Sequence, residues 1–230
     1  MQQPGFLSTF KSRLVSENTK LRTMQGGLLK GLRFPLSLHN QAQVYLGLYE
    51  RETHDWIVRL TDDIHTFVDA GANNGQLSTF ALAKTDARRV LAFEPEVFQH
   101  ESIRIAARAN DVDDADRLRI YSWFLGDDTG EDVRPLDAFQ DEIAYPCFLK
   151  IDVEGGETEV LRGATSVLQE GECRLLVETH AEAKEDECRS ILRRLGYTTQ
   201  VIDHAWWRAI LPFERPRDHN RWLIAHRAVE

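Results

Sequence analysis

Four short apolar runs along this chain each end in an acidic residue. They are Phe67–Val68 before Asp69, Val90–Phe93 before Glu94, Phe148–Ile151 before Asp152, and Leu175–Val177 before Glu178. Apolar runs of this length, separated by helical patterns, predict parallel strands that are buried on both faces of a sheet. Ligands of open α/β sheets bind outside the carboxyl ends of the strands. Clustered carboxylates repel one another, so we interpret the four acids as the rim of an active site and not as packing.

The rest of the pattern predicts helices and further strands around these four runs. Helices are expected over residues 41–60, 77–83, 97–109 and 157–169, and a further helix follows the strand over 174–179 and ends at about residue 195. Other strands are expected over residues 118–124, 198–202 and 221–226. The last two strands have no helix between them. The alternation therefore predicts an α/β fold with helices on both faces of a mainly parallel sheet, closed by an antiparallel hairpin.

The first 33 residues differ in charge from the rest of the chain. They carry six basic residues against Glu17 alone, although the whole chain has a net charge of -9. Phe6, Leu7, Phe10 and Leu14 fall near helical spacing, which predicts a basic helical extension over residues 1–40, followed by one domain over 41–230. This extension is expected to pack on the domain or on a partner such as a second copy of the chain. A cover over the active site and a contact with a membrane surface stay open as alternatives.

Composition narrows the class of protein. A net charge of -9 disfavours generic binding to nucleic acid, because basic surfaces supply that affinity. The odd number of cysteines (Cys147, Cys173 and Cys188) fits neither a disulfide framework nor a metal motif, so reduced thiols are expected. No stretch is long and apolar enough for a membrane helix, and no signal sequence is recognisable, which predicts a cytoplasmic protein.

A glycine-containing turn follows the first apolar run, with the sequence Asp69-Ala70-Gly71-Ala72-Asn73-Asn74-Gly75. Gly71 and Gly75 allow a sharp turn and a close approach of the backbone to a ligand, and the next helix offers free N–H groups there. The spacing is not the GxGxxG of dinucleotide-binding proteins. A turn of this kind is by itself often structural.

The pair Glu94-Pro95 lies at the end of the next strand, nineteen residues after Gly75. A carboxylate at this place can accept hydrogen bonds from both hydroxyls of a ribose. The combination of the glycine turn and this acid predicts an adenosyl ligand, which neither motif would predict alone.

Two further motifs indicate chemistry at the same rim. Lys150 and Asp152 share a face of their strand, as do Glu178 and His180. Buried charges need a partner or a function, so an ion pair of Lys150 with Asp152 or Glu154 is the structural alternative. His180 has an ordinary pKa near neutrality, which suits removal of a proton from a hydroxyl, although a histidine at a strand end is often only hydrogen-bonded.

These motifs together resemble the FkbM family of S-adenosylmethionine-dependent methyltransferases. The resemblance runs over about residues 45–182, from YLGLYE through FVDAGANNG and FEP to FLKIDVEGGETEVLRGA and VETH. It implies the Rossmann-like class I methyltransferase fold, with a seven-stranded sheet and an antiparallel last strand. The helix after Pro95 departs from the family pattern, since it keeps Asn110 but lacks the usual earlier asparagine.

The resemblance also implies roles for individual residues. Asp69, Gly71, Asn73 and Gly75 would line the methionine and ribose of S-adenosylmethionine in a turn that includes Ala72, and Glu94, next to Pro95, would hold the ribose. Asp127 would approach the adenine, and Tyr49 and Glu50 would close over the cofactor. Asp152, Glu154, Glu178 and His180 would face the methyl acceptor, with Lys150 beside the reacting atoms.

The function that this implies is O-methylation of a hydroxyl on a sugar or another small molecule. His180 and Asp152 are equal candidates for the base. Asp152, Glu154 and Glu178 could together bind a divalent cation, as in some O-methyltransferases, but their spacing is not a specific metal signature, so no metal is predicted. Methylation of a protein or nucleic acid, a nicotinamide-dependent oxidoreductase and a binding module without turnover are the alternatives.

Overall fold

One seven-stranded sheet organises the described part of the chain, which comprises residues 19–205 and 220–227 of a computed structural model. The strand order is β10-β11-β9-β8-β3-β4-β5. The strands are β3 (Thr66–Ala70), β4 (Arg89–Phe93), β5 (Leu118–Tyr121), β8 (Cys147–Ile151), β9 (Cys173–Thr179), β10 (Thr198–Ile202) and β11 (Arg221–His226). β11 lies antiparallel between β10 and β9, and the strands from β9 to β5 pair in parallel. The predicted parallel sheet with an antiparallel C-terminal hairpin is confirmed.

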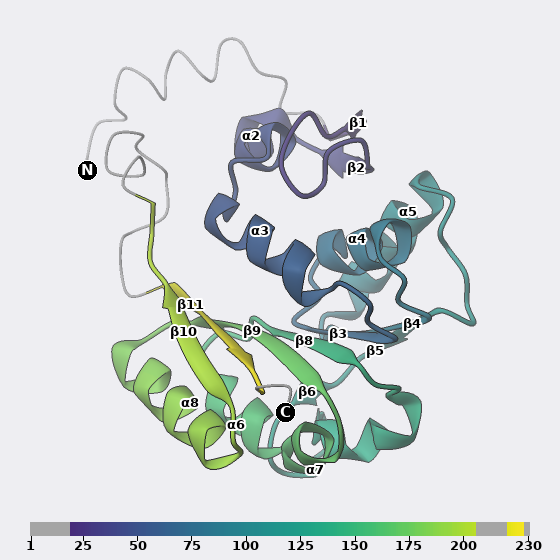
Figure 1. Cartoon of the computed structure of the whole chain (residues 1–230). Coiled ribbons are helices and arrows are strands. Elements are labelled where there is room, and N and C mark those ends of the chain that lie inside the picture. The colour runs from purple at the N-terminus through teal and green to yellow at the C-terminus, as the bar shows by residue number, and fades with distance from the viewer. Residues whose placement is uncertain (1–18, 206–219, 228–230) are drawn as a thin grey trace, which may run out of the picture.

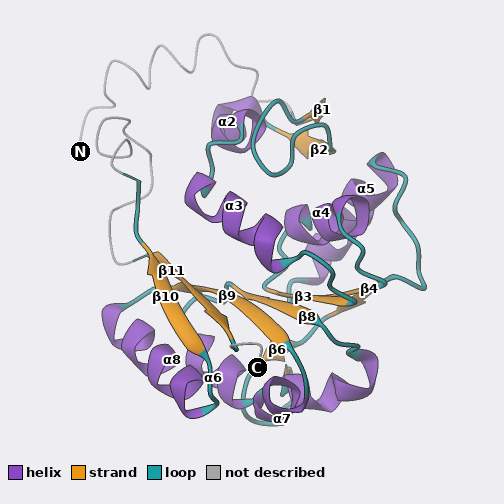
Figure 2. Ribbon diagram, in the orientation of Figure 1, coloured by secondary structure: helices purple, strands orange, loops and turns teal. Residues whose placement is uncertain are grey.

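Helices cover both faces of this sheet (Figure 1). One face carries α2 (Leu38–Leu46), α3 (Arg51–Leu60), α4 (Gln76–Lys84) and α5 (Val97–Ala109), and the other carries α6 (Glu157–Arg162), α7 (Thr165–Glu170) and α8 (Glu182–Arg194) (Figure 2). Successive strand residues point to opposite faces, so Phe67 joins the core under α3–α5 whereas Val68 joins the core over α6–α8. Both side chains are fully buried, which explains why the central strands β3, β4 and β8 are mostly apolar.

Several predicted elements are divided in the structure. The helix expected over 157–169 is interrupted at Gly163, where a Cβ would lie 1.8 Å from the carbonyl oxygen of Gly126. The helix expected over 41–60 is two helices, because Gly47 has a φ of 71° and ends α2. The strand expected over 118–124 stops at Tyr121. A separate two-stranded sheet then follows, formed by β6 (Phe124–Leu125) and β7 (Val133–Arg134), before a 3₁₀ helix, η1 (Leu136–Glu142).

The N-terminal prediction needs a correction. Residues 20–36 do not form a helix but an antiparallel pair of strands, β1 (Lys20–Thr23) and β2 (Arg33–Leu36). The predicted helical positions from Phe6 to Leu14 lie outside the described residues. Met24 and Phe34 are 1% and 2% exposed and share one core with Phe67. Residues 20–36 are therefore anchored on the domain by apolar burial, which was one of the expected arrangements, although as strands and not as a helix. The boundary at residue 40 stays a prediction.

No helix among residues 19–205 and 220–227 combines the length and the apolar character that crossing a bilayer requires.

Candidate active site

The four acids of the predicted rim lie at the carboxyl ends of β3, β4, β8 and β9, which are neighbours in the sheet. Asp69, Glu94 and Glu178 are buried, whereas the side chain of Asp152 is 35% exposed. Carboxylates are rarely buried without a compensating partner. The groups that compensate each acid therefore indicate how the site is built.

The glycine turn is wedged between three strands. Gly71 has a φ of +78°, and a Cβ on it would lie 2.0 Å from the carbonyl oxygen of Asp152, just after β8. The amides of Gly71 and Ala72 both donate to the carbonyl oxygen of Phe93, at the end of β4, over 3.0 Å. Gly75, with a φ of +76°, precedes the first residue of α4. The turn therefore needs glycine at both places, because it packs closely against the loop after β8 at Gly71 and against Ile103 of α5 at Gly75.

Glu94 connects this turn to the end of β4. One of its carboxylate oxygens accepts from the amide of Asn73 over 2.7 Å, and the other accepts from the amide of Glu96 over 2.9 Å. The two motifs that predicted an adenosyl ligand are thus in direct contact. Pro95 lies between the two hydrogen-bonded segments and is half-buried. Each carboxylate oxygen keeps a lone pair for a further donor, such as a ribose hydroxyl.

Lys150 braces the turn from β8. Its Nζ donates to the carbonyl oxygen of Gly71 over 2.8 Å and lies 3.4 Å from a carboxylate oxygen of both Asp69 and Asp152. Asp69 also accepts from the hydroxyl of Ser78 over 2.6 Å. Burial lowers the pKa of Lys150, but the surrounding carboxylates, with Asp152 first, outweigh burial and raise it, so the lysine stays charged. Its donors are used within the protein, which supports the structural alternative for Lys150.

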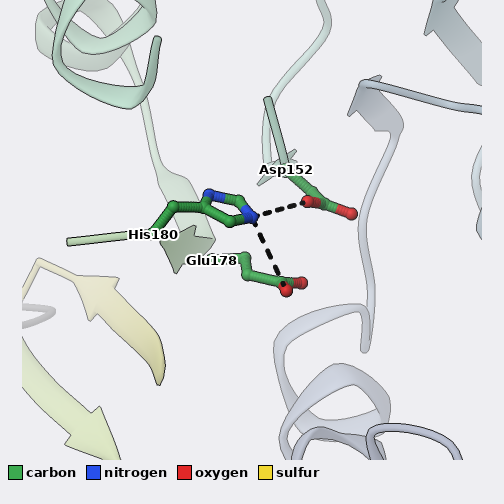
Figure 3. A group of neighbouring side chains, drawn as sticks. All are labelled: Asp152, Glu178 and His180. Carbon is green, nitrogen blue, oxygen red and sulfur yellow. Dashed lines mark ion pairs between the residues drawn. The ribbon is translucent and has the colours of Figure 1, made fainter. Parts of the chain in front are cut away.

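His180 follows β9 and is held by Glu157, the first residue of α6. Nδ1 of His180 lies 2.5 Å from Oε1 of Glu157, which is fully buried. The hydrogen bond with Glu157 raises the pKa of His180, against the opposing effect of burial. Nε2 is left to face Asp152 Oδ1 and Glu178 Oε1, each at 3.8 Å (Figure 3). The structure thus brings Asp152, Glu178 and His180 together as predicted.

Two more residues belong to this cluster. Trp222 on β11 lies opposite Glu178 in the sheet and donates its Nε1–H to Glu178 Oε2 over 3.3 Å. Glu50 precedes α3 with a φ of 46°. Burial, followed by the charges of Glu178 and Asp152, raises the pKa of Glu50 to about 8, while a hydrogen bond with Tyr49 opposes this shift. The YLGLYE segment therefore lies near the acidic rim, and the closure of Tyr49 and Glu50 over a cofactor stays a prediction.

Two predicted residues lie outside the cluster. Glu154 is exposed, and among the described residues its carboxylate makes no ion pair with Lys150. Asp127 pairs with Arg162 of α6 over 3.5 Å, and its contact with adenine stays a prediction. Sequence reasoning missed the roles of Glu157 and Trp222. For Glu157 the available signal was its place as an acid in the first turn of the predicted helix after KIDVEGG. For Trp222 the sequence held no signal, because its pairing with Glu178 joins strands that are more than forty residues apart.

The cavity between α3 and α4 does not belong to this site. It encloses about 660 Å³ and is lined by residues such as Thr61–Asp63 and Thr85–Asp86, which precede β3 and β4. It therefore lies toward the amino ends of these strands, and none of the four rim acids lines it.

Comparison with known proteins agrees with this geometry. The model of the methyltransferase FkbM domain family matches residues 108–199, so the FkbM resemblance is confirmed over that range. An FkbM methyltransferase structure from Methylobacillus flagellatus is similar to the chain at 24% identity and a TM-score of 0.56. The match covers 71% of this chain and 44% of that protein, so the chain spans less than half of its length. No curated protein matches the sequence.

Two more distant structures share the fold. A S-adenosylmethionine-dependent O-methyltransferase from Thermotoga maritima is 14% identical, with a TM-score of 0.53, over 93% of this chain and 79% of that one. An rRNA methylase from Streptococcus thermophilus is 13% identical, with a TM-score of 0.50, over 78% of this chain and 96% of that one. The fold is therefore that of class I methyltransferases, a fold that accommodates different acceptors.

Proposed function

We propose that this protein is a S-adenosylmethionine-dependent methyltransferase that acts on a hydroxyl of a small molecule or sugar. The observation that carries the proposal is the contact between Glu94 and the glycine turn, through the amide of Asn73 at 2.7 Å. It places a buried carboxylate beside a tight glycine turn that leads directly into the first residue of α4. That combination fits an adenosyl cofactor, with Glu94 for the ribose and the turn from Gly71 to Gly75 for the methionine part.

The rim supplies the remaining requirements of a methyl transfer. When bound, S-adenosylmethionine supplies an electrophilic methyl group on a positively charged sulfur. The acidic rim favours a cationic ligand, while Lys150 fixes the turn so that the cofactor and the acceptor are held in one geometry. Such positioning contributes roughly 7–11 kcal/mol to the barrier reduction in well-oriented reactions.

His180 is the better of the two candidate bases in the protein itself. Glu157 holds its Nδ1 at 2.5 Å, so the Nε2 side faces the rim in a defined orientation. Asp152 is already engaged by Lys150 at 3.4 Å. The pairing of a buried acid with a histidine that faces the substrate side is a common way to orient a general base.

Charge guides the choice of acceptor. The net charge of -9 and the acidic rim oppose the phosphate backbone of a nucleic acid, which leaves a small hydroxylated molecule as the preferred acceptor. Methylation of a protein, or adenosyl binding without turnover, would leave the cofactor half of the site unchanged.

Calorimetry with S-adenosylmethionine, S-adenosylhomocysteine and NAD tests the proposal. We expect the two adenosyl-sulfur ligands to bind and NAD to fail, and we expect Glu94→Gln to weaken binding by about tenfold or more, because it loses charge-assisted hydrogen bonds. Glu96→Gln is the matched control, since it removes the same charge from an exposed side chain two residues away. A protein that binds NAD alone, or neither sulfur ligand, would contradict the proposal. Transfer of labelled methyl groups to hydroxylated acceptors then separates an enzyme from a binding module.

A further inference from the structure

Three side chains at the rim surround a common point at ion-pair distances that are too long for hydrogen bonds. The ligand atoms of Asp152, Glu178 and His180 all lie within 4.8 Å of one another (Figure 3). Oδ1 of Asp152 and Oε1 of Glu178 each lie 3.8 Å from Nε2 of His180, which is too far for a hydrogen bond. Ligand atoms at about 2.0–2.2 Å from one metal ion lie roughly 3–4 Å apart, so this spacing fits shared coordination better than direct pairing.

Each of these side chains is held from behind by a different partner. Nδ1 of His180 is bound to the fully buried Glu157 at 2.5 Å, which is the arrangement that fixes the ring of a metal-binding histidine. Glu178 accepts from Trp222 over 3.3 Å, and Asp152 pairs with Lys150 at 3.4 Å. Oδ1 of Asp152, Oε1 of Glu178 and Nε2 of His180 lie around the common point. A site oriented in this way by neighbouring residues is more than a chance gathering of acids.

The charges around the point also call for a cation. Asp152 and Glu178 belong to the cluster, and Glu50 interacts with both. Lys150 is the positive group beside them, but Asp69 at 3.4 Å already offsets its charge. A divalent cation would offset the repulsion among the carboxylates of Glu50, Asp152 and Glu178.

We propose that Asp152, Glu178 and His180 form a binding site for a divalent transition-metal ion. One imidazole nitrogen and two carboxylate oxygens suit Mn²⁺, Fe²⁺ or Zn²⁺, whereas Ca²⁺ and Mg²⁺ prefer sites made of oxygen alone. Three protein ligands leave coordination positions for other groups, as in catalytic metal sites. With the ion bound, His180 is a ligand, and the ion takes over its part in activating an acceptor hydroxyl; this role rests on the proposed methyl transfer.

Metal binding is measured without the cofactor, so that the two proposals are tested separately. Full-length protein treated with a chelator and dialysed is titrated by calorimetry with MnCl₂, ZnCl₂ and CaCl₂. We expect one Mn²⁺ or Zn²⁺ per chain, with Zn²⁺ tighter than Mn²⁺ and Ca²⁺ weakest. Glu178→Gln and His180→Gln should each weaken Mn²⁺ binding by tenfold or more. Glu154→Gln is the matched control, because it removes a nearby charge from an exposed side chain outside the cluster.

Absence of both Mn²⁺ and Zn²⁺ binding would overturn the metal site, as would equal binding by the wild type, Glu178→Gln and His180→Gln. Circular dichroism establishes that each variant is folded. If either variant fails to fold, Asp152→Asn replaces it, since Asp152 is the most exposed of the three ligands. Binding of S-adenosylmethionine that persists when metal binding is absent would refute the metal site and leave the proposed cofactor site intact.

Discussion

At the scale of single residues, the turn between β3 and α4 depends on glycine for two separate reasons. Gly71 has a positive φ, and the carbonyl of Asp152 occupies the place of its Cβ at 2.0 Å. Gly155 also has a positive φ, of +84°, but nothing lies within 4 Å of its Cβ position. Substitution of each glycine by alanine therefore separates the cost of backbone strain, which both share, from the cost of the contact with Asp152, which only Gly71 has.

We expect Gly71→Ala to lower the free energy of unfolding by roughly 3–5 kcal/mol, because it adds a backbone clash to the strain of a positive φ. Gly155→Ala should cost only about 1–2 kcal/mol, from strain alone. Urea unfolding of both variants measures the difference. Equal losses in the free energy of unfolding would mean that the backbone of Asp152 moves away from residue 71 at little cost, and that the turn is not held rigidly against β8.

Residue identities at the rim could be predicted, but only some of their partners could. Strand ends and the glycine spacing placed Asp69, Glu94, Asp152 and Glu178 at one edge, because strand periodicity is local. The ion pair of Lys150 with Asp152 was predicted because the two residues share a face of one strand, whereas its pair with Asp69 depends on which strand lies beside β8. Likewise, Glu157 meets His180 only after α6 packs under the sheet.

At the scale of elements, a histidine joins α3 to the N-terminal segment. Nδ1 of His54 accepts from the amide of Leu28 over 3.1 Å, and Nε2 donates to the carbonyl oxygen of Tyr49 over 3.0 Å. Burial, followed by the charge of Arg51, lowers the pKa of His54 from 6.5 to about 4. The neutral ring therefore holds the segment, since a protonated Nδ1 could no longer accept.

This histidine makes stability depend on pH. The unfolded chain binds the proton at about pH 6.5 and the folded chain only near pH 4, so the stabilisation present above pH 6.5 is lost as the pH falls toward 4. Between pH 7.5 and 5 the free energy of unfolding should fall by up to about 2 kcal/mol from this group. Urea unfolding of the wild type and His54→Gln at both values measures it. Equal pH dependence in the two proteins would contradict the assignment.

Helices and strands could be predicted wherever the apolar periodicity of the sequence continued and no contact with a distant segment divided the element. The helix over 97–109 and the final two strands follow their sequence pattern. The helix over 157–169 was predicted as one because its apolar period continues past Gly163, whereas the contact with Gly126 that divides it is formed by a distant loop. The β1–β2 pair was missed because its short strands carry too few residues to show alternation.

At the scale of the whole molecule, residues 1–33 contain two parts whose removal should have different effects. Leu28, Leu29, Leu32 and Met24 are each less than 10% exposed and pack in the core with Phe67. Removal of residues 1–33 should therefore unfold the protein, since each buried side chain is worth about 2–5 kcal/mol against a total stability of about 5–15 kcal/mol. Such a deletion cannot test the hypothesis that the basic segment covers the acceptor.

Removal of residues 1–18 alone gives the sharper experiment, because it removes Lys11, Arg13 and the apolar positions from Phe6 to Leu14 while the described core residues from Met24 to Phe34 stay in place. We expect this truncation to keep the melting temperature and the affinity for S-adenosylmethionine, since the rim and the glycine turn are untouched. If the segment covers the acceptor, the KM for the acceptor should rise severalfold while cofactor binding is unchanged. Unaltered acceptor kinetics would instead assign these residues to a partner or to a second copy of the chain, which sedimentation of the two proteins would distinguish.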